Sequence, residues 1–110
     1  MTALLVAVGG AVGAVLRFLA GHRWDRDLPA GTLLVNVAGS FLLGVFSALS
    51  LDRDALALLG TGFCGGLTTY SAFAVQTHAL GGRRRGAGYA AATVVLALGA
   101  CGAGFWVAQA

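Results

Sequence analysis

Four apolar segments, each close to the roughly 20 residues that cross a bilayer as a helix, leave this chain little choice of fold. They cover about residues 2–21, 31–51, 55–80 and 86–108, and the short connections between them hold nearly all of the charge. Hydrophobic residues make up 58% of the 110 residues and charged residues only 10%, whereas a soluble domain carries about 25% charged residues. The sequence therefore predicts an all-α membrane protein: one unit, residues 1–110, with four transmembrane helices.

The third segment contains a stretch that is poor material for a helix facing lipid. Two glycines are followed by hydroxyl residues and aromatic rings, in the order Gly65-Gly66-Leu67-Thr68-Thr69-Tyr70-Ser71-Ala72-Phe73. A helix can break at membrane depth only where protein or water surrounds the break. Broken membrane helices commonly turn backbone carbonyls and amides toward bound ions. The stretch predicts a break in the third helix and a binding site at the break.

Acidic residues are absent from the apolar segments, which excludes several functions. The chain has no Glu, and all four Asp lie in the connections. A proton-coupled exporter of the small multidrug-resistance type needs an acid at depth, and an acidic ring is typical of cation channels. No Ser/His/Asp arrangement is evident either, so we expect no enzymatic activity. Cys64 and Cys101 form no metal-binding motif, and burial as small apolar residues is favoured over a disulfide.

The few polar residues inside the segments are candidates for function, because such residues are costly in a membrane. Asn36 either ties two helices together or presents an N–H to an anion. Arg17 lies near the end of the first segment. Its guanidinium either reaches the lipid headgroups or faces inward and steers an anion toward a vestibule.

The fourth segment has a stripe with a four-residue spacing, in which each residue shares one helix face with the next. It consists of Tyr89, Thr93, Ala97 and Cys101. The hydroxyl groups of Tyr89 and Thr93 are suited to a polar track. The alternative is a tyrosine at the membrane interface and a threonine bonded to its own helix.

Two kinds of ligand suit the chemistry of the break. Tyr70 and Phe73 share a helix face, and the positive edges of their rings suit a small anion. With the Asn36 amide and the hydroxyls of Thr69 and Ser71 they predict an anion path of weak contacts, although a core aromatic pair is the alternative. Carbonyls freed between Gly65 and Thr68 suit a hard cation instead.

Small residues in the first segment are spaced for close helix packing, at Gly9/Gly13 and at Gly10/Ala14. Such pairs let two helix backbones approach each other. The pattern leaves open whether the partner helix belongs to the same subunit or to another.

Three blocks of the chain resemble the signature blocks of the CrcB/Fluc fluoride channels. They are the first-segment block GGAVGAVLRF, the second-segment block GTLLVNVAGSF and the third-segment block GFCGGLTTYSAF, which begin at Gly9, Gly31 and Gly62. Each block alone is a weak signal, but the three follow one another in the family's order along nearly the whole chain.

The resemblance implies an antiparallel dimer of four-helix subunits in the cell membrane, with two fluoride pores and a central structural sodium ion. Backbone carbonyls of Gly65 and Thr68 from both subunits would bind the sodium. The residues matching the pore are Asn36, Phe73, Tyr89 and Thr93, and Arg17 matches the arginine of the first block, whereas Ala97 and Cys101 depart from the family's polar track. Tyr70 stands where the family usually has phenylalanine and adds a hydroxyl.

The function that this resemblance implies is passive export of fluoride. The alternatives are an exporter similar to the small multidrug-resistance proteins and a membrane subunit that transports nothing.

Arginines are distributed unevenly between the two ends of the predicted bundle. The first and third connections together hold five arginines, and the second holds only Arg53. The positive-inside rule places the first and third connections in the cytoplasm and both termini outside. We therefore expect one fixed orientation and a partner of opposite orientation, an oppositely inserted paralogue in a heterodimer. A homodimer of a chain that inserts both ways is the alternative.

Overall fold

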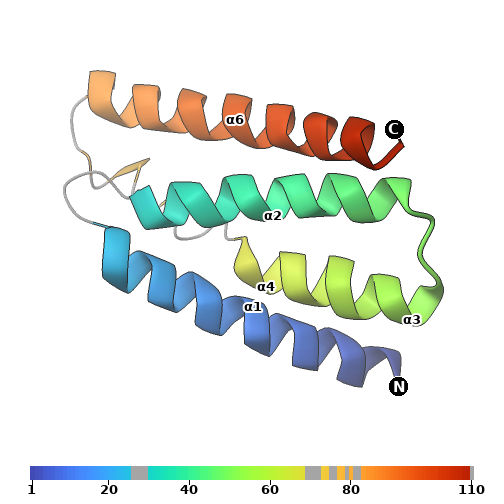
Figure 1. Cartoon of the computed structure of the whole chain (residues 1–110). Helices are drawn as coiled ribbons and strands as arrows, with labels where there is room; N and C mark the ends of the chain where they lie inside the picture. Colours follow the sequence, from blue (N-terminus) through green and yellow to red (C-terminus); the bar gives the residue numbers. More distant parts are fainter. Residues whose placement is uncertain (26–29, 69–72, 75–76, 79, 81–82, 110) are drawn as a thin grey trace.

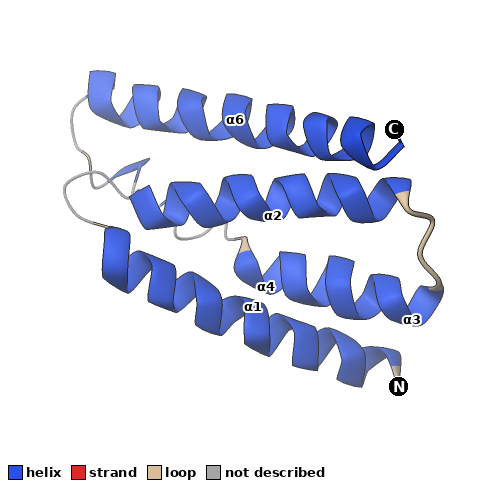
Figure 2. Cartoon of the chain, viewed as in Figure 1, coloured by secondary structure: helices blue, strands red, loops and turns tan. Residues whose placement is uncertain are grey.

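The computed structural model describes residues 1–25, 30–68, 73–74, 77–78, 80 and 83–109. Helices account for most of this part of the chain (Figure 2). Three of them are long and apolar enough to cross a membrane: α1 (Thr2–Trp24), α2 (Ala30–Ala48) and nearly all of α6 (Arg83–Gln109). The chain is therefore an all-α, multi-pass membrane protein.

The helices lie side by side in an elongated molecule of 44 × 30 × 19 Å. Figure 1 shows α2 between α6 on one side and the run α3–η1–α4 on the other, with α1 along that run. Both chain termini and the connection from α2 to α3 lie at one end. The end of α1 and the starts of α2 and α6 lie at the opposite end.

The third segment consists of α3 (Arg53–Ala55), η1 (Leu56–Cys64) and α4 (Gly65–Leu67). The Asp52 side chain caps its start by accepting the Ala55 N–H at 2.8 Å. η1 is a π-helix of nine residues, a wide form that is usually confined to single turns. The run from Leu56 to Leu59 is apolar throughout, so it shows no periodic alternation of polar and apolar residues. The sequence therefore does not predict this form of helix.

Helical backbone in this segment ends at Leu67, well before the expected boundary at Leu80. Thr68 has extended backbone, with φ −83° and ψ 156°. Phe73–Ala74 and Thr77–His78 are again helical. Two other boundaries also differ from expectation: α1 continues to Trp24 rather than ending near Gly21, and α6 begins at Arg83.

Glycines let α1 approach η1 and α4 backbone to backbone. A Cβ on Gly9 would collide with the carbonyl oxygen of Leu58, and a Cβ on Gly13 with that of Phe63. Gly66 of α4 meets Gly10 of α1 in the same way. The small-residue pairs of the first segment thus pack within one chain.

A similar contact joins α2 to α6. A Cβ on Gly44 would collide with the carbonyl oxygen of Cys101, and a Cβ on Gly104 with that of Phe41. The outer faces are apolar and open: Val95 is 67% exposed and Trp106 is 70% exposed. Such faces suit lipid or a second subunit.

Asp25, directly after α1, is hydrogen-bonded to the start of α2. Its carboxylate accepts the Thr32 backbone N–H at 3.0 Å and the Thr32 hydroxyl at 2.9 Å. One of the N–H groups that a helix start leaves without an intrahelical partner is thereby paired. The two helices also approach closely, since a Cβ on Gly31 would collide with the Ala20 carbonyl.

The α1–η1 contact predicts that two glycine substitutions differ in their effect on stability. Gly13→Ala places a methyl group against the Phe63 carbonyl, and overpacking of this kind costs about 1–3 kcal/mol. Gly99→Ala is the matched control, because a Cβ there meets nothing within 4 Å. We expect a lower midpoint of thermal unfolding in detergent for Gly13→Ala and an equal or higher one for Gly99→Ala. Equal midpoints for the two variants would contradict the packing.

Candidate functional site

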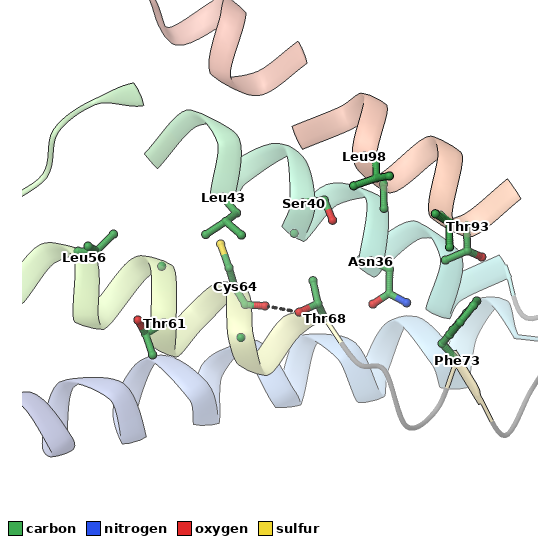
Figure 3. Close-up of a pocket in the computed structure, with 15 residues that line it drawn as sticks. Asn36, Ser40, Leu43, Leu56, Thr61, Cys64, Thr68, Phe73, Thr93 and Leu98 are labelled. Carbon is green, nitrogen blue, oxygen red and sulfur yellow. Dashed lines mark hydrogen bonds between the residues drawn. The ribbon is translucent and has the colours of Figure 1, made fainter. Parts of the chain in front are cut away.

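A cavity of about 640 Å³ lies between α2, the η1–α4 run and α6 (Figure 3). Both apolar and polar side chains line it. They are Asn36, Gly39, Ser40, Leu43, Leu56, Gly60, Thr61, Cys64, Gly65, Thr68, Phe73, Thr93, Val94, Ala97 and Leu98.

The α2 wall of the cavity carries Asn36 and Ser40, which are four residues apart and share one helix face. Asn36 is only 8% exposed. Figure 3 shows its amide extending from α2 toward the space between Thr68 and Phe73. Gly39 allows α4 to approach at the same level, because a Cβ there would collide with the Thr68 methyl group. The amide therefore lies next to the end of α4.

Hydrogen bonds occupy two of the carbonyls at the end of α4. The Cys64 carbonyl accepts the Thr68 N–H at 3.0 Å and the Thr68 hydroxyl at 2.8 Å (Figure 3). The Gly66 carbonyl accepts the Nε–H of Arg17 at 3.1 Å. A cation at a helix C-terminus is also favoured by the helix dipole.

Arg17 has a contact that neither sequence-based alternative included. It lies on α1 and is half-buried. The glycine contact between α1 and α4 brings its Nε to the Gly66 carbonyl. The role of Arg17 in steering anions stays a prediction.

Gly65 and Thr68, the residues expected to bind sodium, lie beside the cavity. Gly65 lies in an open place, where a Cβ would meet nothing within 4 Å, and both residues line the cavity. The extended backbone of Thr68 turns its carbonyl out of the helical hydrogen-bond pattern. Among the described residues, no group of three His, Cys, Asp or Glu side chains lies close enough together to hold a metal ion. Backbone oxygens are thus the donors that this region offers to a hard cation.

The α6 wall supplies buried hydroxyl groups. Tyr89 and Thr93 are each 5% exposed, and their side chains interact with each other. Neither hydroxyl has a hydrogen bond of good geometry in the described part of the protein. The same holds for the Thr77 hydroxyl. The Tyr89 ring contacts that of Phe73, with centroids 5.7 Å apart and planes tilted by 36°. A buried hydroxyl left unpaired costs about 1–3 kcal/mol, which an acceptor bound beside it would offset.

The structure brings most of the predicted site residues together. Five line the cavity directly: Asn36, Gly65, Thr68, Phe73 and Thr93. Tyr89 lies against Phe73, and Ala97 also lines the cavity. Cys101 lies farther along α6, where its carbonyl meets Gly44. Thr69, Tyr70 and Ser71 lie outside the described residues.

Sequence reasoning missed four polar residues of this region. Ser40 could have been found from its four-residue spacing to Asn36. Thr61 and Cys64 line the cavity from η1, whose π-helical register an α-helical pattern does not reveal. Thr77 lies in the short helical stretch Thr77–His78 and had no motif to mark it. Cys64 and Cys101 are both free thiols.

The chemistry of the cavity favours an anion. Its described lining includes an amide, hydroxyls and an aromatic ring, and no carboxylate. Hydroxyl and amide groups donate hydrogen bonds to an anion, and a ring edge carries partial positive charge. None of these groups holds a fixed full charge, so the contacts are weak enough to release a bound ion.

Comparisons with known proteins agree with this chemistry. The family described as "CrcB-like protein, Camphor Resistance (CrcB)" matches residues 4–105. A protein of Rhodococcus jostii named fluoride-specific ion channel FluC 2 is 52% identical, over 96% of each chain. A FluC 2 of Mycobacterium bovis is 42% identical over 98% of this chain and 96% of its own. A protein of Thermobifida fusca named FluC 1 is 44% identical, over 88% of this chain and 94% of its own.

The family match covers nearly all of the chain, and the relatives cover it at both ends. These relatives are named as ion channels, not as enzymes. The chain belongs to the CrcB-like family.

Proposed function

We propose that this chain is a subunit of a fluoride channel that lowers cytoplasmic fluoride by passive export. The observation that carries the proposal is the cavity between α2, α4 and α6, whose polar lining consists of donors and ring edges without a carboxylate. The names of the relatives point to the same ion. The chain has no acidic residue in its apolar segments that could bind a coupling proton, which weighs against a multidrug exporter.

Fluoride would pass along a row of weak contacts. Asn36 would supply an amide, Phe73 a ring and Thr93 a hydroxyl along the cavity. Tyr89, whose ring contacts that of Phe73, would supply a second hydroxyl. The roles of Thr69, Tyr70 and Ser71 as further pore residues stay predictions, since the three lie outside the described residues. Repeated weak contacts suit conduction, because an ion must leave each site as easily as it enters.

The proposed subunit is a single four-helix unit, residues 1–110, whose third membrane helix is broken after Leu67. The extended backbone at Thr68 and the return of helix at Phe73 support the break. Two subunits would associate in antiparallel orientation. The exposed apolar faces of the molecule and the small interior of one subunit support the association.

A structural sodium ion, which is not transported, would lie where the two breaks meet. The carbonyls of Gly65 and Thr68 would hold it, because hydrogen bonds already occupy the carbonyls of Cys64 and Gly66. Such an ion would supply a fixed positive charge between the ends of the two broken helices.

The partner would be an oppositely oriented paralogue. Arg23 at the end of α1 and Arg84 and Arg85 at the start of α6 lie at one end of the molecule, and Arg53 lies at the other (Figure 1). The arginine-rich end would face the cytoplasm. Relatives named FluC 1 and FluC 2 are consistent with paired paralogues.

Removal of one pore hydroxyl predicts slower fluoride transport. In liposomes containing the chain together with its paralogue, Thr93→Val is expected to slow fluoride efflux about tenfold, the effect of one lost hydrogen bond to a charged group. Ser47→Ala is the control, because Ser47 is exposed, does not line the cavity and donates its hydroxyl to the Leu43 carbonyl of its own helix at 2.8 Å. Chloride efflux should stay negligible throughout. Absence of fluoride efflux from the unchanged chain, alone and with its paralogue, would refute the channel.

Sodium is expected to stabilise the assembled protein without being transported. A ligand at 100 times its dissociation constant adds about 2.7 kcal/mol of stability. The midpoint of thermal unfolding in detergent should therefore rise with sodium chloride and not with N-methylglucamine chloride at equal ionic strength. Equal midpoints in the two salts would contradict a sodium site.

The charge asymmetry predicts one orientation for the chain expressed alone. A reporter fused after Ala110 should be outside the cell, because five arginines hold the first and third connections in the cytoplasm. Fusion after Asp52 should likewise be outside. A substantial cytoplasmic fraction of either reporter would favour a homodimer that inserts both ways.

A further inference from the structure

A third buried hydroxyl without a hydrogen-bond partner lies outside the cavity, on Thr77. The residue belongs to the helical stretch Thr77–His78, and its Oγ1 atom is inaccessible to solvent. It packs against α6 at Gly86: a Cβ on Gly86 would lie 3.0 Å from the Thr77 carbonyl oxygen and 3.9 Å from its methyl group. Thr77 is thus held against α6 one turn before Tyr89.

The contacts with α6 place three hydroxyl-bearing residues one after another along this helix. Thr77 meets α6 at Gly86, and Phe73 meets it at Tyr89. Thr93, one turn further along α6, lines the cavity. The residues Thr77, Tyr89 and Thr93, which carry the three buried hydroxyls, therefore follow one another along α6, from near its first turn to the cavity.

The outer end of this row lies next to positive charge. α6 begins with three consecutive arginines and has no acidic residue in its first turn. Arg84 and Arg85 are exposed. A helix start already carries partial positive charge, and these arginines add to it, so anions are concentrated at this end.

We propose that Thr77 is a further fluoride contact, which extends the hydroxyl row of Tyr89 and Thr93 toward the arginine-rich start of α6. The inference rests on the proposed function and adds a step to it. A hydroxyl can donate to fluoride, which accepts hydrogen bonds only. Fluoride would pass from the arginines to Thr77, then along Tyr89 to Thr93 and the cavity.

The test compares fluoride efflux from liposomes that contain the chain with its paralogue. Thr77→Val keeps the shape of the side chain and removes the donor, and we expect efflux about tenfold slower. Thr77→Ser keeps the hydroxyl and should retain most of the rate. Thr77→Cys, which has a weaker donor of similar size, should also be slow and provides a second variant if valine impairs folding. Ser47→Ala is the control with an unchanged rate.

The outcomes separate this inference from the proposed function. If the unchanged chain conducts fluoride and monodisperse Thr77→Val and Thr77→Cys conduct it equally fast, the Thr77 hydroxyl is satisfied by water or serves packing, and the inference is wrong. If Thr77→Ser is as slow as Thr77→Val, the effect is one of packing and the inference is also wrong. If no preparation conducts fluoride, the proposed function fails and this contact fails with it.

Discussion

The end of α4, partway along the bundle of helices, is the constraint on which the rest of the structure depends (Figure 1). The last carbonyls of a helix have no intrahelical partner, and lipid offers none. At the end of α4 the protein itself supplies the hydrogen-bond donors. Thr68 donates its N–H and its hydroxyl to the Cys64 carbonyl, and Arg17 donates its Nε–H to the Gly66 carbonyl. A polar end of this kind is stable only when other helices enclose it.

That enclosure depends on glycine. Gly9 and Gly13 let α1 lie directly on η1 and α4, which is what brings Arg17 within 3.1 Å of the Gly66 carbonyl. On the other side, Gly39 lets α2 approach Thr68 and so places Asn36 beside the same helix end. The placement of Arg17 and Asn36 thus depends on the close packing of the backbones. A larger side chain at these glycines would separate the helices and displace both polar groups.

Sequence patterns predicted the class of the fold and most of the candidate site. Four apolar segments long enough to span a membrane were expected from the sequence, because lipid requires long apolar runs. In the described residues three helices reach that length, and the fourth span stays a prediction. Asn36, Phe73 and Thr93 were marked as polar or aromatic residues in an apolar setting, and all three line one cavity. The π-helix, the contact of Arg17 and the hydroxyl of Thr77 were not predicted. Each depends on backbone register or on a neighbour distant in sequence, which local spacing does not encode.

By itself the sequence determined that the chain is an all-α membrane protein and marked its third segment as unusual, since apolar length and glycine placement are local properties. It left open whether the Gly9 and Gly13 face meets its own chain or another. Only the tertiary structure decided this, by pressing α1 against η1 and α4. It also decided which carbonyls at the end of α4 are paired. Those pairings join residues up to 49 positions apart, and such contacts exist only after the helices have packed.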